Sequence, residues 1–203
     1  MAAVSETIVR EYFELHEFLV RQHRKYIAQT RREDDDIDFF VLNPHPQPRG
    51  EERPFVLASP DLPFIDRAIV VVKGWHTETF SSARLASTPE IFRFVEPGVF
   101  QQAERAFGKS GSLMKMLVVP ALPQESQARD ESIALLRAKG IDAVIPFRTM
   151  LTDLVAHVEV NRNYQKSDLL QVIRILKNYD FFKEPQMELF KSKRRRRKQR
   201  TDA

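Results

Sequence analysis

The 203-residue sequence predicts an α/β layer fold, and three features of the chain lead to that prediction. An unbroken apolar run, Ala68–Val72, contains four β-branched residues and is too short for a membrane span, which is typical of a buried strand. Strand and helix patterns alternate after residue 65, which favours some parallel pairing. An amphipathic pattern near the N-terminus predicts a first helix.

The first helix is predicted from Val4 to about Glu17, because its apolar residues recur on one broad face. Glu6 is three residues before Val9 and seven before Phe13, so it lies on the same stripe, whereas Glu11 points away. An acid on the buried stripe of a helix needs a partner or a metal ion. Glu6 is therefore the first polar residue that the fold alone does not explain.

Residues 18–30 fit a strand that carries Arg21, Arg24 and Lys25, although a continued helix also fits the pattern. On residue type alone, an ordinary solvated face accounts for these three basic residues. Residues 31–36 are predicted to form a charged turn.

A second strand is predicted over Ile37–Asn43. Asp36 and Asp38 share a face of this strand with Phe40, so Asp38 is an acid inside an apolar strand. The Pro-rich residues 43–54 that follow must form a loop.

The rest of the chain continues the alternation of helices and strands. The predicted elements are a short strand at Phe55–Leu57, the Ala68–Val72 strand, a helix from Thr88 (N-cap) and Pro89 to Phe107 with a break at Pro97-Gly98, a strand Leu113–Val119, a helix Gln127–Lys139 closed by Gly140, a strand Ile141–Phe147, a helix from Arg148 to about Val160, and a helix Lys166–Asn178 capped by Ser167 or Asp168.

Lys73 is the third unexplained polar residue, because it ends the long apolar strand. It shares a strand face with Ile69 and Val71. Burying an ammonium group at the end of a core strand costs free energy unless a carboxylate pairs with it or its aliphatic stem lets it reach solvent. Taken singly, Glu6, Asp38 and Lys73 each have an ordinary structural explanation, so any function depends on the three together.

The net charge of +4 describes the end of the chain rather than its body. Residues 191–200, KSKRRRRKQR, hold eight basic side chains, and the chain before Lys191 carries 24 basic and 27 acidic residues, a net charge of −3. We expect one domain over residues 1–182 and a flexible basic tail over 183–203. The tail fits nucleic-acid contact, an address signal or a solubilising end.

Cysteine is absent, which excludes disulfides, thiolate zinc sites and cysteine nucleophiles. Only six glycines are present and none form a phosphate-binding loop, which argues against nucleotide folds that use one. No membrane span or signal peptide is recognisable, and we expect a cytoplasmic protein without a membrane partner.

The order of Glu6, Asp38 and Lys73 resembles that of the restriction-endonuclease-like superfamily, the PD-(D/E)XK nucleases. The sequence is most similar to the Holliday-junction-resolvase type, in which an early helical Glu precedes an Asp-initiated strand and a strand ending in acid–X–Lys. The matching segments are EFLV at 17–20, IDFFVLN around Asp38 and IVVVKGW around Lys73. The resemblance covers about the first 120 residues. It implies a central mixed sheet flanked by helices, with an extra C-terminal strand and helices.

The resemblance implies catalytic roles for Glu6, Asp38 and Lys73 and a bound Mg²⁺ or Mn²⁺. In the family the metal is held by the motif Asp, by the acid of acid–X–Lys and by the backbone carbonyl of the X residue, here Val72. The position of that acid is Val71 in this chain. Either the acid has migrated or the site is inactive.

Three acids are candidates for the migrated ligand. Glu6 ranks first because its helical stripe already faces the core, followed by Asp36 on the strand face of Asp38 and by Glu78 in the loop after Lys73. The metal ligands expected are therefore Asp38, Glu6 and the carbonyl of Val72.

The function implied by the resemblance is metal-dependent hydrolysis of DNA phosphodiester bonds by an endonuclease. The alternative is a catalytically inactive protein of the same fold that serves as a nucleic-acid-binding or assembly module. DNA is the expected partner, and a homodimer is implied because resolvase-type relatives commonly pair. The candidate nucleic-acid-binding residues are Arg21, Arg24, Lys25, Trp75, His76, Arg194, Arg195, Arg196 and Arg197.

Overall fold

The computed structural model describes residues 2–22, 37–48, 53–108 and 112–182. Its centre is a five-stranded mixed sheet in the order β1-β2-β3-β4-β5. The pairs β1–β2 and β2–β3 are antiparallel, and the pairs β3–β4 and β4–β5 are parallel. The strands are β1 Leu19–Gln22, β2 Phe39–Leu42, β3 Arg67–Val72, β4 Leu113–Val119 and β5 Ala143–Pro146. The predicted α/β class with a mixed sheet is thus confirmed.

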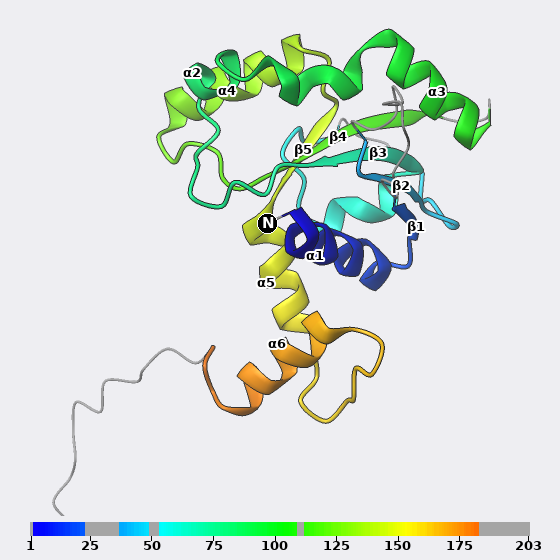
Figure 1. The fold of residues 1–203 in the computed structure, drawn as a ribbon, viewed down its shortest axis with the longest axis vertical. Coiled ribbons are helices and arrows are strands. Elements are labelled where there is room, and N and C mark those ends of the chain that lie inside the picture. The colour runs from blue at the N-terminus through cyan, green and yellow to red at the C-terminus, as the bar shows by residue number, and fades with distance from the viewer. Residues whose placement is uncertain (1, 23–36, 49–52, 109–111, 183–203) are drawn as a thin grey trace, which may run out of the picture. The chain divides into compact units, whose positions relative to one another are not determined.

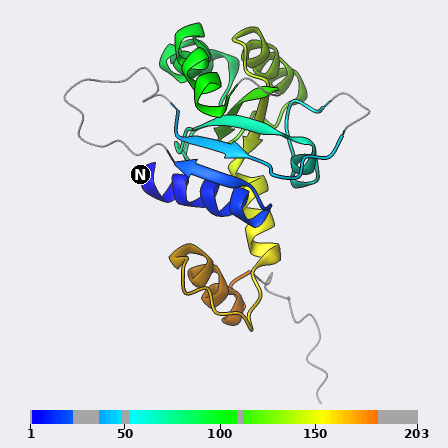
Figure 2. The same ribbon diagram turned by 90° about the vertical axis from the view of Figure 1, so that its right-hand side faces the viewer.

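Helices cover both faces of this sheet (Figures 1 and 2). On one face, helices α1 (Ala2–Leu15) and α5 (Phe147–His157) pack against each other and the strands. The other face carries α2 (Ser82–Ala86), the 3₁₀ helix η3 (Pro89–Val95), α3 (Pro97–Phe107) and α4 (Ser126–Ala138).

The strand β3 lies at the centre of the core, as its β-branched run predicts. Its residues from Arg67 to Val71 are buried. Ile69 and Val71 join an apolar cluster with residues of η3 and α4, so they face that layer of helices. Because side chains alternate along a strand, Ala68 and Val70 face the side of α1.

Several predicted elements are confirmed with small shifts of their ends. The first helix begins two residues early, and residues 19–22 form a strand rather than a continued helix. The strand Leu113–Val119 and the break at Pro97 are also confirmed. The helix before Gly140 ends at Ala138, one residue earlier than predicted, and this glycine has a φ of 87° that favours glycine.

Three local predictions are wrong. Residues 89–95 form a 3₁₀ helix rather than an α-helix; Thr88 holds the N-cap position before Pro89 as predicted, but its hydroxyl donates to the carbonyl of Arg84 and makes no capping hydrogen bond. The short helix α2 follows the loop after Lys73, in a stretch for which no helix is predicted. Residues 55–57 contribute only a bridge from Val56 to Val144, and η2 (Ser59–Phe64) follows as a 3₁₀ helix.

The chain divides into two compact units, Met1–Val158 and Glu159–Ala203. The first unit contains the whole sheet. The described part of the second unit contains α6 (Asp168–Asn178), and Ser167 caps it by accepting a hydrogen bond from Leu170 N at 3.3 Å. The expected boundary near residue 182 remains a prediction.

None of the helices in the described ranges has the length and apolar content needed to cross a membrane.

Candidate functional site

The carboxyl-terminal end of β3 lies beside the start of β2 and the end of β1. This end of the strands is called an edge of the sheet below. The register pairs Gln22 with Phe39 and Phe39 with Val70, so residues just outside these pairs lie near the same edge. Asp38 immediately precedes β2, and Lys73 immediately follows β3. Two of the predicted site residues therefore lie on neighbouring strands at one edge.

Asp38 is held against the end of β3 by two hydrogen bonds. Its backbone N–H donates to the carbonyl of Val70 at 3.1 Å, and its Oδ2 accepts from Val72 N at 2.7 Å. The carboxylate thus continues the ladder between β2 and β3 where the regular strand pairing ends. The residue after Val72 is Lys73, whose N–H donates to the carbonyl of Val118 in β4 at 3.0 Å. Asp38 and Lys73 are both half-buried.

Glu6 reaches this edge from α1. Its Oε2 accepts a hydrogen bond from Nε2 of Gln22 at 2.6 Å, which fixes the carboxylate beside the last residue of β1. One residue earlier, Ser5 Oγ lies 2.9 Å from Nε2 of His76. The start of α1 is therefore tied to both β1 and the loop after β3. Glu6 thus lies on the α1 face of the sheet, at the end of the strands where Asp38 precedes β2 and Lys73 follows β3.

Gly74 allows α1 to approach so closely. A Cβ atom at this position would lie 2.2 Å from Ser5 Oγ and 2.9 Å from Ser5 Cβ. Ser5 is 1 % exposed, so its side chain has little room to move away. The contact between Ser5 and Gly74 therefore sets how near Glu6 comes to the end of β3.

Gly74→Ala is expected to lower the free energy of unfolding by about 1–3 kcal/mol, because the new methyl group overlaps Ser5. Ser5→Gly removes both overlapping atoms and should restore most of this loss in the double variant. Chemical denaturation of the four proteins in this mutant cycle measures the coupling between the positions. Additive effects of the two substitutions would contradict the contact.

Position 71 belongs to the core. Val71 is 1 % exposed and packs in the apolar cluster with Ile69 and Leu117. The residue two before Lys73 thus contributes no oxygen to the edge. Among the described residues, no group of three or more His, Cys, Asp or Glu side chains is arranged to hold a metal ion. Among the described residues that the sequence singles out, Glu6 and Asp38 supply carboxylate oxygens at this end of the strands.

The other proposed replacement acids differ in their surroundings. Glu78 Oε2 lies 3.4 Å from Nε of Arg84, in an ion pair of half-exposed side chains. Asp36 lies outside the described residues. Glu11 is 7 % exposed, so the prediction that it points away from the core is wrong.

The candidate nucleic-acid-binding residues have different environments. Arg21 is exposed, with its guanidinium 5.9 Å from the ring centre of Phe40. Trp75 packs edge-on against Phe80, and the guanidinium of Arg84 lies 5.3 Å from its ring centre. His76 is exposed and contacts the ring of Phe147 as well as Ser5. The remaining candidates, Arg24, Lys25, Arg194, Arg195, Arg196 and Arg197, lie outside the described residues.

Gln22 and Ser5 are the site neighbours that sequence reasoning missed. Gln22 lies within a polar stretch, where one amide gives no signal of its own. Strand alternation offers a partial clue, because Gln22 shares a face with Val20. Ser5 reads as a helix start, yet α1 begins at Ala2 and Ser5 lies inside it.

Comparison of the chain with protein-family models, with curated proteins and with solved structures gave no match.

Proposed function

We propose that the chain is a metal-dependent nuclease of the restriction-endonuclease-like type that hydrolyses DNA phosphodiester bonds. The observation that supports this most is the placement of two carboxylates and a lysine at one edge of the sheet. The Asp38 carboxylate accepts a hydrogen bond from the backbone N–H of Val72, the residue before Lys73. The Glu6 carboxylate accepts one from the side chain of Gln22 at the end of β1. Two carboxylates and an ammonium group at one end of a sheet are the residue types needed to bind a divalent cation and a phosphate.

The donor set fits Mg²⁺ or Mn²⁺, because carboxylate and carbonyl oxygens are the hard ligands these ions prefer. Asp38, Glu6 and the carbonyl of Val72 would hold the ion. The metal supplies Lewis acidity and activation of water. Lys73 neutralises negative charge on the scissile phosphate as it develops, which is the contribution of this chain's own cation.

The alternative function is nucleic-acid binding or assembly without catalysis, and Val71 favours it. A buried valine stands where an acidic ligand is expected, so the edge offers one carboxylate fewer to the metal. Under this alternative, the protein binds DNA but cleaves none with any divalent cation.

The deciding experiment compares Asp38→Asn with Asp142→Asn in DNA cleavage assays. Asp142 makes the same kind of contact as Asp38, because its Oδ2 accepts from Lys115 N at 2.7 Å. It lies where β4 and β5 begin, at the opposite end of the strands. Asparagine keeps an acceptor oxygen in both variants but removes the charge. Both variants are therefore expected to keep the fold. They differ in how far the altered carboxylate lies from the proposed site.

Supercoiled, linear, single-stranded and branched DNA are incubated with Mg²⁺ or Mn²⁺. Wild type and Asp142→Asn are expected to cleave at similar rates, and Asp38→Asn at least about 100-fold more slowly. Binding without cleavage by the wild type under every condition would support the alternative function. Equal cleavage by the wild type and Asp38→Asn would overturn the site.

A further inference from the structure

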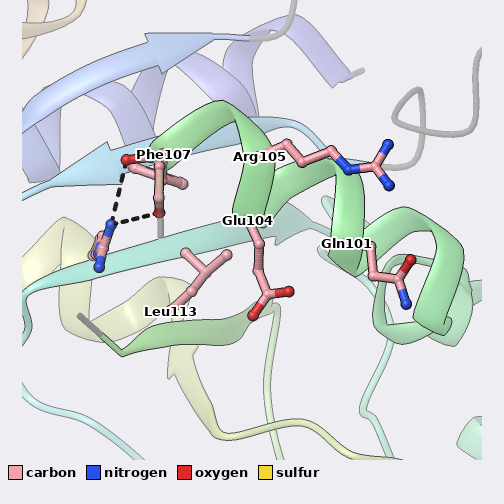
Figure 3. A pocket seen from close by; sticks show the side chains of 7 residues that line it. Gln101, Glu104, Arg105, Phe107 and Leu113 are labelled. Carbon is pink, nitrogen blue, oxygen red and sulfur yellow. Dashed lines mark hydrogen bonds between the residues drawn. The ribbon is translucent and has the colours of Figure 1, made fainter. Parts of the chain in front are cut away.

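A cavity of about 450 Å³ opens at the opposite edge of the sheet, where β3 and β4 begin (Figure 3). This size is typical of pockets for small molecules. The lining residues come from the starts of β3 and β4 and from the last turns of α3; they are Arg67, Gln101, Glu104, Arg105, Phe107, Gly108 and Leu113. The cavity is separate from Glu6, Asp38 and Lys73, which lie at the other end of β3.

Arg67 is a buried cation with incomplete hydrogen bonding. The residue is 4 % exposed, and its Nη1 donates to the carbonyls of Phe107 and Gly108, both at 3.4 Å. Within the described residues, its Nε and Nη2 are buried without a hydrogen bond. Asp66 Oδ2 lies 3.5 Å from Nε, in an ion pair that does not reach hydrogen-bond geometry.

A structural role accounts for only part of this arrangement. Nη1 satisfies carbonyls at the C-terminal end of α3, where a cation also suits the helix dipole. The Nε–Nη2 edge gains nothing from that contact. Buried donors without acceptors are costly and uncommon in folded proteins, so a ligand that supplies acceptor oxygens to Nε and Nη2 would relieve this cost.

We propose that this cavity binds a small organic carboxylate, with Arg67 as the residue that recognises its anionic group. The adjacent Nε and Nη2 donors form the planar fork that pairs with the two oxygens of a carboxylate. The contacts of Nη1 are long, so a small rotation of the guanidinium can turn this edge toward the cavity.

The other residues that line the cavity favour a ligand with an apolar body and a single negative charge. Phe107 and Leu113 supply apolar surface next to Arg67. Figure 3 shows Glu104 extending from α3 toward β4, while Arg105 points outward. The carboxylate of Glu104 repels further negative charge, so a monoanion fits better than a phosphate dianion.

The test measures binding of 3-phenylpropanoate to the full-length protein by isothermal titration calorimetry. Its neutral amide and inorganic phosphate serve as comparison probes. Wild type is expected to bind the carboxylate at least tenfold more tightly than either comparison probe. Only 3-phenylpropanoate has both a carboxylate to pair with Nε and Nη2 of Arg67 and an apolar ring to fill the cavity.

Two variants locate the binding. Arg67→Lys is expected to weaken carboxylate binding at least tenfold, since lysine cannot present the fork. Glu104→Gln keeps Arg67 in place and should tighten binding severalfold by removing the repulsion, which gives a readout even where Arg67→Lys fails to fold.

Absence of carboxylate binding to the wild type would overturn the proposal. Equal affinity for the acid and its amide, or tighter binding of phosphate, would also overturn it. An unchanged affinity in folded Arg67→Lys, or an unchanged or weaker affinity in Glu104→Gln, would do the same.

Discussion

Lys73→Met is expected to slow DNA cleavage by about 100- to 1,000-fold while the protein stays folded. Under the proposed function, the ammonium group is the positive charge that this edge offers to a scissile phosphate, and methionine keeps an apolar stem of similar length. Because the side chain is half-buried and follows the last residue of β3, its loss should change the free energy of unfolding by no more than about 1 kcal/mol. Initial cleavage rates and denaturation midpoints measure the two effects.

Lys115→Met is the matched control for this prediction. Lys115 is also half-buried on a strand, with its Nζ 4.7 Å from the ring centre of Phe100. It lies near the start of β4, away from the proposed site. This variant should keep the cleavage rate of the wild type. Parallel losses in both lysine variants would show a general effect of charge and contradict a specific role for Lys73.

Val71→Glu is expected to lower the free energy of unfolding by about 3–5 kcal/mol without divalent cations, because it places a carboxylate in the apolar cluster. Burial raises the pKa of a carboxyl group, so the variant binds protons more tightly when folded and its loss of stability grows as pH rises. Urea denaturation at two pH values measures both effects.

Divalent cations should reverse part of this loss. Phe39 pairs with Val70, so extension of the antiparallel register brings position 71 opposite Asp38. A glutamate there adds the carboxylate that the acid–X–Lys pattern lacks, and Mn²⁺ should raise the melting temperature of Val71→Glu more than that of wild type.

Ile69→Glu is the control for cation binding, since Ile69 is buried in the same cluster but farther from the end of β3. It should lose stability without recovering it on addition of Mn²⁺. An equal response to Mn²⁺ in wild type and Val71→Glu would count against a metal position beside Asp38.

Elements with long apolar runs could be predicted from the sequence, because burial on both faces leaves a continuous pattern. The strands around Val70 and Leu117 are examples. The 3₁₀ helix at 89–95 could not be told from an α-helix, since Ile91, Phe92 and Phe94 are all buried and their spacing fits either form. The five residues of α2 are too few to show a period.

The site could be predicted in part for a different physical reason. Asp38 and Lys73 stand out because each is a charged residue directly beside an apolar run, and a single sequence shows such residues directly, although the strands themselves begin after Asp38 and end before Lys73. The contact between Ser5 and Gly74 joins residues far apart in the chain and depends on how closely α1 packs. Likewise, the sequence shows that Val71 occupies the position where the acid is missing. The burial of Val71 in the apolar cluster emerges only from the fold.

The most direct test of the central claim is an anomalous difference map from a crystal of the protein soaked in Mn²⁺. The proposed nuclease site predicts a peak within ligand distance of the carboxylates of Asp38 and Glu6 and of the carbonyl of Val72, at about 2.0–2.3 Å. No peak at this edge, or peaks only at other acidic side chains, would contradict the claim that these groups share one ion.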